Sequence, residues 1–336
     1  MTGTVRHATP DLDALAERWA VGARLVHQRR DPRRSFAIRR FAGPLDHLGK
    51  VGHLRVAHLT DLHVGAVTPL AVQFAAVELT NAANPDLVVL TGDFVCHSQL
   101  YLADLEEVVR GFRAPVFAVL GNHDHWSGAS AVRRSLRRAG AEVLDNAHTV
   151  VELHHERLQI VGLDDAYTGH AWRPRAVRGL RRDLATIGLS HIAEEADGLW
   201  AAGVPLVLSG HTHAGQVTLA RLHEQLVGRV AGHRYVHGLY GRRRPERPGE
   251  GAVYVGAGVG AAVMPLRLGE RARREIAIFE LGHEPGRYEE HHAEQRPMPG
   301  RRPAPRTQYA RAAHVVRREA RRRARTGSTA PEEPEP

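Results

Sequence analysis

Short apolar runs alternate with amphipathic segments along most of the chain from Leu54 onward. A leucine- and valine-rich run such as 87–90, followed by a Thr-Gly turn, is typical of a buried strand, whereas apolar positions three or four residues apart predict helices. We expect strands at 54–59, 86–91, 115–120, 157–163, 185–190, 205–209, 252–256 and 275–281, and helices at 70–82, 100–111, 129–139 and 192–201. This alternation predicts the α/β fold class, and the closeness of 148–153 to 157–163 predicts an antiparallel hairpin.

The two ends of the chain follow another pattern. Residues 12–26 have the spacing of an amphipathic helix and precede the basic stretch 29–34. Residues 301–325 are rich in arginine and poor in apolar side chains, and the chain closes on a polar, proline-rich segment. We therefore expect three parts: an accessory helix and basic segment at 1–50, a folded domain at 51–283, and a disordered Arg/Pro-rich tail at 284–336.

Composition narrows the class of protein. The 336 residues are 43% hydrophobic, which is enough for a buried core, and the single cysteine, Cys96, excludes a disulfide scaffold and suits a reducing, cytoplasmic compartment. No stretch approaches about 18 consecutive apolar residues, and no signal-peptide pattern is visible. We expect a soluble protein that contacts a membrane peripherally at most.

Basic residues exceed acidic ones, with 46 Lys and Arg against 37 Asp and Glu and a formal net charge of +9. Much of this excess lies in the tail, so it describes the tail better than any active site. Two interpretations of a basic tail or N-terminal segment stay open: contact with an anionic membrane, or contact with the phosphates of a nucleic acid. The tail has only Tyr309 for stacking on bases, which disfavours nucleic acid.

Candidate metal ligands follow the ends of five predicted strands. In extended backbone, residues i and i+2 point to the same face, so Asp61 and His63 of the D-x-H motif can grip one ion together, and the H-x-H motif is another i, i+2 pair. The set comprises Asp61, His63, Asp93, Asn122, His191, His211 and His213. Because α/β sheets bind ligands beyond the carboxyl ends of their strands, we expect these side chains to converge.

Imidazoles, carboxylates and one amide oxygen suit divalent cations, and the set lacks the thiolates of a structural zinc site. Seven ligands are too many for one four-coordinate ion, but they fit two ions about 3.5 to 4 Å apart that share a carboxylate. Asp93 is the natural bridge because it stands between the two halves of the set in the sequence. The alternative for each residue taken singly is a capping or turn role.

In this order the motifs D-x-H, G-D, G-N-H-D, a lone His and G-H-x-H resemble the calcineurin-like metallophosphoesterase superfamily. The resemblance covers roughly residues 54 to 281 and implies a four-layer α/β/β/α sandwich with two mixed sheets. It also implies two divalent ions, Mn²⁺ first and Fe, Zn, Mg or Ni as alternatives. One metal would be held by Asp61, His63, Asp93 and His213, and the other by Asp93, Asn122, His191 and His211.

Further matches at 143–146, 162–165, 208–216, 237–240, 254–260 and 265–267 resemble a bacterial branch of membrane-associated phosphodiesterases and a UDP-diacylglucosamine hydrolase. The implied substrate is a small-molecule or lipid-linked phosphate ester. Cys96 departs from the family, because many members have an acid there and the purple acid phosphatases have a tyrosine. The basic loop 241–248 is expected to be either a solvated face or a contact for an anionic substrate.

Two close cations lower the pKa of a shared water toward about 7 and neutralise phosphoryl oxygens, so we expect a metal-bridging hydroxide to attack in line. His123 is expected to protonate the departing oxygen, with Asp124 orienting its ring. The favoured function is therefore a metal-dependent phosphoesterase acting on a diester or pyrophosphate. A nuclease that uses the basic tail and a non-catalytic scaffold of the same fold are the alternatives.

Overall fold

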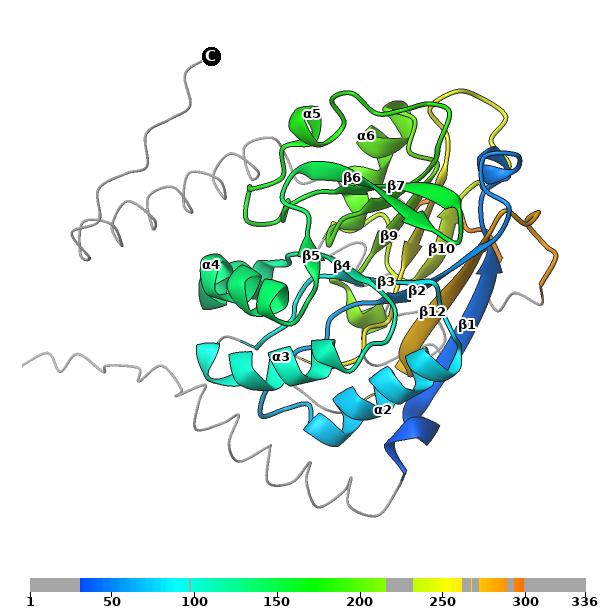
Figure 1. Ribbon diagram of the computed structural model, residues 1–336. Coiled ribbons are helices and arrows are strands. Elements are labelled where there is room, and N and C mark those ends of the chain that lie inside the picture. The colour runs from blue at the N-terminus through cyan, green and yellow to red at the C-terminus, as the bar shows by residue number, and fades with distance from the viewer. Residues whose placement is uncertain are drawn as a thin grey trace, which may run out of the picture.

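The computed structural model describes residues 31–96, 98–215, 232–261, 267, 272–288 and 293–298. The helix predicted at 12–26 and the arginine-rich segment 301–325 lie outside these residues. The described chain forms two six-stranded sheets with helices on their outer sides (Figure 1).

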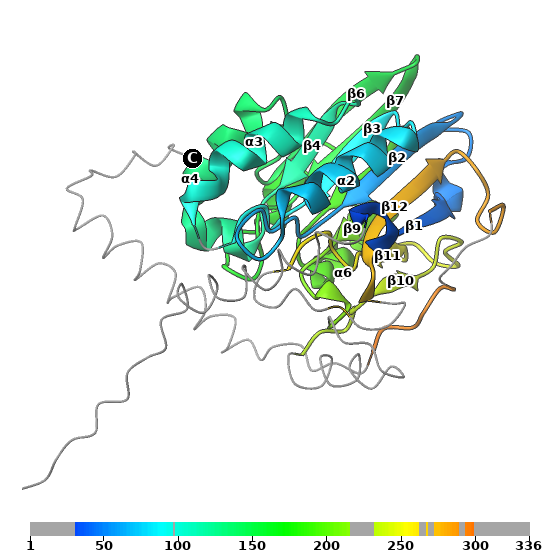
Figure 2. The ribbon, with the colours of Figure 1, turned by 90° about the horizontal axis from the view of Figure 1, so that it is seen from below.

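The first sheet has the strand order β1-β12-β2-β3-β4-β5. Its strands are β1 (Phe36–Ala42), β2 (Leu54–Leu59), β3 (Leu87–Thr91), β4 (Val116–Val119), β5 (Glu142–Val143) and β12 (Arg274–Leu281). Strands β2 to β5 are parallel, whereas β12 runs antiparallel to β2 and parallel to β1. Helices α2 (Leu70–Ala82), α3 (Leu102–Arg110) and α4 (Asn122–Arg138) cover its outer face, as Figure 2 shows from below.

The second sheet has the order β10-β11-β9-β8-β7-β6. Its strands are β6 (Ala147–Leu153), β7 (Glu156–Gly162), β8 (Ala185–Leu189), β9 (Leu206–Ser209), β10 (Gly238–Gly241) and β11 (Ala252–Val255). The predicted hairpin is confirmed, because β6 and β7 pair in antiparallel register. Short helices α5 (Arg173–Ala176) and α6 (Ala196–Ala201) lie on the other face, and the 3-10 turns are η1 (Pro32–Ser35), η2 (Leu45–His47), η3 (Gln99–Tyr101), η4 (Ala193–Glu195) and η5 (His213–Gly215).

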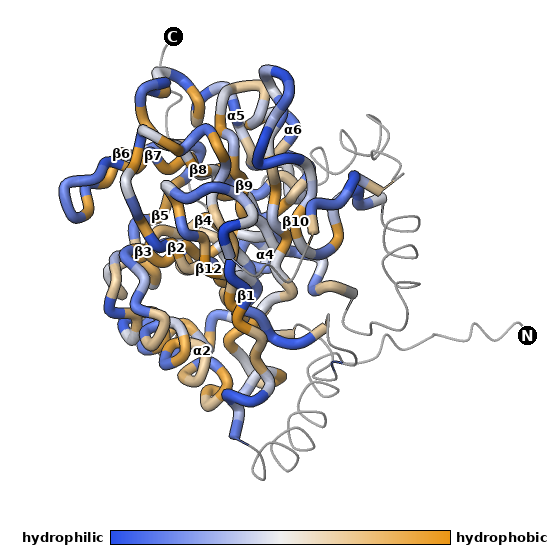
Figure 3. Tube along the Cα trace, turned by 90° about the vertical axis from the view of Figure 1, so that its right-hand side faces the viewer, coloured by the Kyte–Doolittle hydropathy of each residue, from blue (hydrophilic) through white to orange (hydrophobic). Residues whose placement is uncertain are grey.

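Apolar side chains from the inner faces of both sheets form one core. Phe41, Val89 and Phe117 of the first sheet pack with Ile187 and Tyr254 of the second. Figure 3 shows hydrophobic colour in the region of β2 and β12 as well as along α2. Each sheet buries its other face under helices. The predicted four-layer α/β/β/α arrangement with two mixed sheets is therefore confirmed, and it brings the carboxyl ends of β2, β3, β4, β8 and β9 into one region.

Strand β1 was not expected, because its sequence mixes arginine with apolar residues inside the segment predicted to be accessory. The structure explains the arginines: Arg39 is buried and its Nε lies 3.4 Å from Oε2 of Glu275, while Arg40 donates to Glu280 at 2.8 Å. Both acids belong to the neighbouring strand β12. The arginines of β1 suggest a solvent-exposed segment in the sequence, but in the fold they pair with acids of β12. The apolar pattern expected of a strand is therefore not visible in the sequence of β1.

Helix α4 begins seven residues earlier than the predicted 129–139 segment. The G-N-H-D motif forms its start. The helix begins there because the Asp124 carboxylate accepts a hydrogen bond at 2.9 Å from the amide of Gly121, the residue that caps the helix. A left-handed Gly128, with φ of 109°, interrupts the helix. The turn before this interruption is polar, and the helical spacing of apolar residues begins only after residue 128. The sequence pattern therefore predicts only the second half of α4.

Residues near the described C-terminal end pack on the domain although they fall within the predicted tail. Gln295 accepts from Gly241 at 3.0 Å and donates its own amide to Leu239 at 2.8 Å, which extends the edge at β10. In the basic loop 241–248, Arg242, Arg243 and Arg244 form ion pairs with Glu246, Glu294 and Glu284, respectively. These pairs favour the interpretation of the loop as a surface feature over a contact with anionic substrate.

The role of β1 in the core can be tested with a matched pair of substitutions on that strand. Phe41 is fully buried, with ring centroids 5.0 Å from Tyr254 and 5.2 Å from Phe279. Phe41→Ala should lower the free energy of unfolding by about 3–5 kcal/mol through lost burial and a cavity. Ile38→Ala, at a position 44% exposed, should change it by no more than about 1 kcal/mol. Urea unfolding measures both, and equal small effects would contradict the place of β1 in the core.

Candidate metal centre

Six of the seven predicted ligands converge at the ends of the strands that they follow. Asp61, His63, Asp93 and His213 each offer one ligand atom, and these four atoms all lie within 4.8 Å of one another. Ligand atoms of Asp93, His191 and His211 form a second such group. The two groups share Asp93, the residue whose position in the sequence predicts the bridge.

Short distances between like or polar atoms mark the centre. The Nε2 atoms of His63 and His213 lie 3.0 Å apart, and Nε2 of His213 is 3.4 Å from Oδ1 of Asp61. Oδ2 of Asp93 lies 3.6 Å from Nε2 of His63 and 3.3 Å from Nε2 of His191. Several electron pairs therefore point into one small volume, as they do around a cation.

Five candidate ligands have a left-handed backbone conformation. Their φ values are 51° for Asp61, 44° for His63, 55° for Asp93, 77° for His211 and 51° for His213. Such a conformation costs on the order of 1–3 kcal/mol at each non-glycine residue and persists where the surroundings enforce it. Concentrated strain of this kind is typical of a functional site.

Backbone hydrogen bonds between neighbouring strand ends hold these turns. The amide of Asp61 donates to the carbonyl of Gly92 at 3.0 Å, and the amide of His63 donates to the carbonyl of Asp93 at 2.9 Å. The amide of His211 donates in turn to Oδ2 of Asp61 at 3.1 Å. The D-x-H, G-D and G-H-x-H motifs therefore support one another directly.

Asp124 anchors the Asp93 turn and does not orient His123 as expected. Its fully buried carboxylate accepts from the amides of Asp93 at 2.9 Å, Phe94 at 2.8 Å, Val95 at 3.3 Å and Gly121 at 2.9 Å. Burial and then the Asp93 carboxylate raise the pKa of Asp124 to about 7, and the amide bonds oppose this by favouring the charged form. The expected contact with the His123 ring fails because both carboxylate oxygens are used on backbone amides.

The glycines that precede Asn122 and His211 lie so close to neighbouring atoms that no side chain can replace them. A Cβ on Gly121 would lie 2.3 Å from Oδ1 of Asp93, and a Cβ on Gly210 would lie 1.9 Å from Oγ1 of Thr60 and 2.5 Å from Oδ2 of Asp61. No side chain fits at either position. The glycines before Asn122 and His211 are thus a packing requirement of the centre.

Three buried ligand atoms lack hydrogen bonds: Oδ1 of Asp61, Oδ1 of Asn122 and Nε2 of His191. An unsatisfied buried polar atom costs about 1–3 kcal/mol. The other ring nitrogen of His191 lies 2.7 Å from the carbonyl of Thr91, which fixes the ring orientation and leaves Nε2 facing Asp93. Divalent cations would satisfy all three atoms, so the residues present fit a metal centre.

Burial keeps three of the histidine rings neutral. It lowers the pKa of His63 and His211 well below the usual value and lowers the pKa of His213 as well. Burial also lowers the pKa of His191, but the adjacent Asp93 carboxylate outweighs it and raises that pKa to about 10. A cation bound beside Asp93 would replace this proton, and the neutral rings keep a lone pair for coordination.

Comparison with known proteins identifies the family. A model of the calcineurin-like phosphoesterase family matches residues 54–215. Phosphodiesterase YaeI of Escherichia coli is 30% identical over 233 residues, which cover 68% of this chain and 82% of that protein. The chain belongs to the calcineurin-like phosphoesterase family.

This calcineurin-like phosphoesterase has further relatives and structural neighbours. YkuE of Bacillus subtilis, named a metallophosphoesterase, is 29% identical over 68% of this chain and 78% of its own length. A 5'-nucleotidase precursor from Thermus thermophilus superposes with a TM-score of 0.45 and 20% identity over 62% of this chain, and this chain spans 49% of that one. No helix of the described residues is long and apolar enough to cross a bilayer. The protein is a metal-dependent phosphoester hydrolase, as its family and relatives show.

Aromatic side chains flank the centre of this phosphoesterase. The centroid of the His123 ring lies 4.8 Å from that of the His63 ring and 4.8 Å from that of the Trp126 ring. Trp126 is 37% exposed. Tyr167, 5.3 Å from the His211 ring, and Trp126 face each other edge to face. The sequence analysis missed Tyr167, since only folding brings the loop after β7 to the centre. Tyr240, in contrast, is buried in the core.

The packing requirement at Gly210 can be tested against a second glycine. Gly210→Ala should displace Thr60 and Asp61 and lower the affinity for divalent metal by about 10–100-fold. Gly140→Ala adds only the cost of a left-handed alanine, about 1–2 kcal/mol, because no atom lies within 4 Å of its Cβ position. Metal content after dialysis measures the difference. Equal metal retention in the two variants would show that the centre tolerates a methyl group at 210.

Proposed function

We propose that the protein hydrolyses a phosphodiester or a pyrophosphate with the help of two divalent cations. The observation that carries this proposal is the pair of ligand groups that share Asp93, within 4.8 Å in each group. Asp61, His63, Asp93 and His213 would hold one cation, and Asp93, Asn122, His191 and His211 the other. Mn²⁺ is the first candidate, because the carboxylate and amide oxygens suit it, and the imidazoles also suit Fe, Zn and Ni.

The bound cations would lower the pKa of a water molecule and neutralise the charge on the phosphoryl oxygens. The chain itself supplies the fixed geometry. Asp93 is aligned on both of its oxygens, because Oδ1 accepts from the amide of His123 at 2.9 Å while Oδ2 faces the imidazoles. Such preorganisation means that little rearrangement is needed when charge develops on phosphorus.

His123 is the proposed general acid. Its Nε2 lies 3.9 Å from Oδ2 of Asp93, so it borders the centre without joining either ligand group around Asp93. The side chain is 14% exposed, whereas His63 and His191 are fully buried. A ring at the boundary between the ligands and solvent can reach the departing oxygen and recover a proton from water.

The phosphodiester preference rests on a relative and on the surroundings of His123. YaeI is named a phosphodiesterase. The leaving group of an unactivated diester is an alkoxide, which needs a proton more than the leaving group of an activated ester does. His123 is suited to supply that proton. Trp126 and Tyr167 would contact the organic part of such a substrate. The alternative of a non-catalytic scaffold is disfavoured, because all seven ligand positions carry a residue that can bind a metal.

Removal of metal and of the shared carboxylate tests the proposed centre. Protein freed of metal should regain hydrolysis of a generic aryl phosphodiester when Mn²⁺ is restored. Asp93→Asn should abolish that activity and lower metal content, because the amide cannot bridge two cations. Asp183→Asn, at an exposed position, is the matched control and should behave like the unsubstituted protein. Equal activity with and without metal would overturn the proposal.

The role of His123 is tested separately by His123→Gln. This variant should retain both metals yet lose about 10²–10⁴-fold in kcat on esters with poor leaving groups, and much less on aryl esters that need no proton. His155→Gln, at an exposed position, serves as the control. Loss of metal in His123→Gln would reassign the residue as a ligand, and an equal loss of rate on both kinds of ester would remove its role as the acid.

A further inference from the structure

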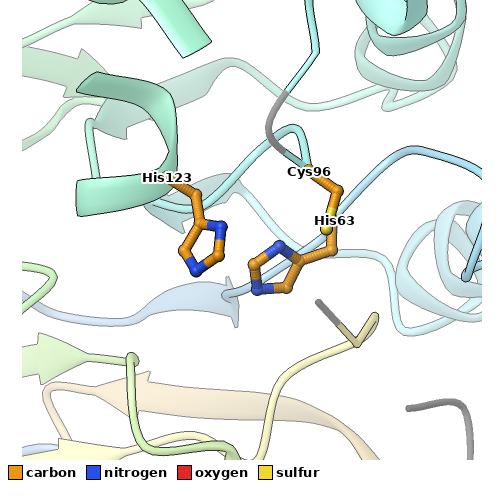
Figure 4. A group of neighbouring side chains, drawn as sticks. All are labelled: His63, Cys96 and His123. Carbon is orange, nitrogen blue, oxygen red and sulfur yellow. The ribbon is translucent and has the colours of Figure 1, made fainter. Parts of the chain in front are cut away.

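A thiol lies beside the proposed centre. Cys96, the only cysteine of the chain, follows Asp93 by three residues. Its Sγ, one ring nitrogen of His63 and one ring nitrogen of His123 all lie within 4.8 Å of one another. Figure 4 shows a ring nitrogen of His63 turned toward the space between Cys96 and His123. This group shares His63 with the first ligand group and does not contain Asp93.

The second nitrogen of His63 supplies an independent sign of a ligand. His63 is fully buried, and its Nε2 faces Asp93 and His213. Its Nδ1 is buried and makes no hydrogen bond. A histidine that binds a metal normally donates its other N–H to a partner, and Nδ1 has none of the usual carboxylate or carbonyl partners. The ring therefore has unused binding capacity on the side of Cys96.

We propose that Cys96, His63 and His123 form a further site for a soft divalent cation, Zn²⁺ or Cd²⁺, and that occupancy of this site inhibits hydrolysis. One thiolate and two imidazoles are ligands that select such cations, and water would fill the fourth tetrahedral position. Bonds of about 2.0–2.3 Å to sulfur and nitrogen place tetrahedral ligands roughly 3.3–3.8 Å apart. Small side-chain rotations from the observed separations reach that geometry.

Binding is a substitution at sulfur and at Nδ1 of His63. The bond between Sγ and the cation replaces the S–H bond, and the bond to Nδ1 replaces the N–H bond of a ring that binds the first metal through Nε2. Both protons go to solvent, and no electron is transferred. Hard cations such as Mn²⁺ and Mg²⁺ bind sulfur weakly and therefore leave the Cys96 thiol protonated. The same protein would thus use one class of cation for hydrolysis and respond to another.

Inhibition follows from the two histidines, and this step rests on the proposed function. A cation on His123 takes the electron pair that would carry the proton for the leaving group. A cation on Nδ1 of His63 also places a second positive charge across the ring from the first metal, and the two charges repel each other. The soft cation therefore acts on the acid and on the first metal group together.

The experiment uses the full chain loaded with Mn²⁺ and titrated with Cd²⁺. Because Cys96 is the only cysteine, any sulfur-to-cadmium charge-transfer absorption arises from this site. We expect one equivalent of this absorption in the unsubstituted protein and none in Cys96→Ser. Half-inhibition of phosphodiester hydrolysis should require at least tenfold more Cd²⁺ in Cys96→Ser. Cys96→Ala, compared by thermal unfolding, replaces the serine variant if that variant fails to fold.

Absence of the absorption band in the unsubstituted protein would overturn the site. Equal inhibition of the unsubstituted and Cys96→Ser proteins would overturn the inhibitory role, because Cd²⁺ would then act only by exchange into the Mn²⁺ centre. The absorption needs no turnover, so it tests the cation site even if phosphodiester hydrolysis itself fails. The band together with Cys96-dependent inhibition would establish both parts.

Discussion

The Asp124 carboxylate is the interaction on which the centre depends most. It accepts from the amides of Asp93, Phe94, Val95 and Gly121, and so joins the turn after β3 to the start of α4. Charge-assisted hydrogen bonds are about twice as strong as neutral ones, and four of them share one buried carboxylate. They hold Asp93 in a left-handed conformation, and Asp93 belongs to both ligand groups. The strain at the shared ligand is thereby balanced by the residue three positions into the following helix.

Much of this organisation could be predicted from the sequence, because two regular patterns carry it. Buried parallel strands produce continuous apolar runs, so most strands and helix α2 lie within a residue or two of the predicted ranges. Ligand types at strand ends predicted which side chains converge. The predictions failed where long-range partners decide the outcome: Arg39 is buried only because Glu275 meets it from β12, and Asp124 turns to the backbone only because Asp93 folds against it.

The layered fold explains why the ligands come from distant segments. Each sheet contributes strand ends to one rim, with Asp61 and Asp93 from the first and His191 and His211 from the second. The core between the sheets fixes the spacing of these rims, so the distance between ligand groups is set by packing of side chains such as Val89 and Ile187. Helix α4 and the loop after β7 then add what the sheets cannot provide, namely the aromatic side chains of Trp126 and Tyr167, respectively.

The left-handed backbone at five ligands has a consequence for how the family's sequences can vary and how they are probed. Asp, Asn and His are the non-glycine residues that adopt positive φ most readily, and they are also good metal ligands. Metal coordination and backbone conformation therefore favour the same few residue types at Asp61, His63 and Asp93. Alanine at any of these positions removes a ligand and also destabilises the turn, so alanine scanning would overstate the contribution of the metal, whereas asparagine tolerates positive φ and leaves the turn intact.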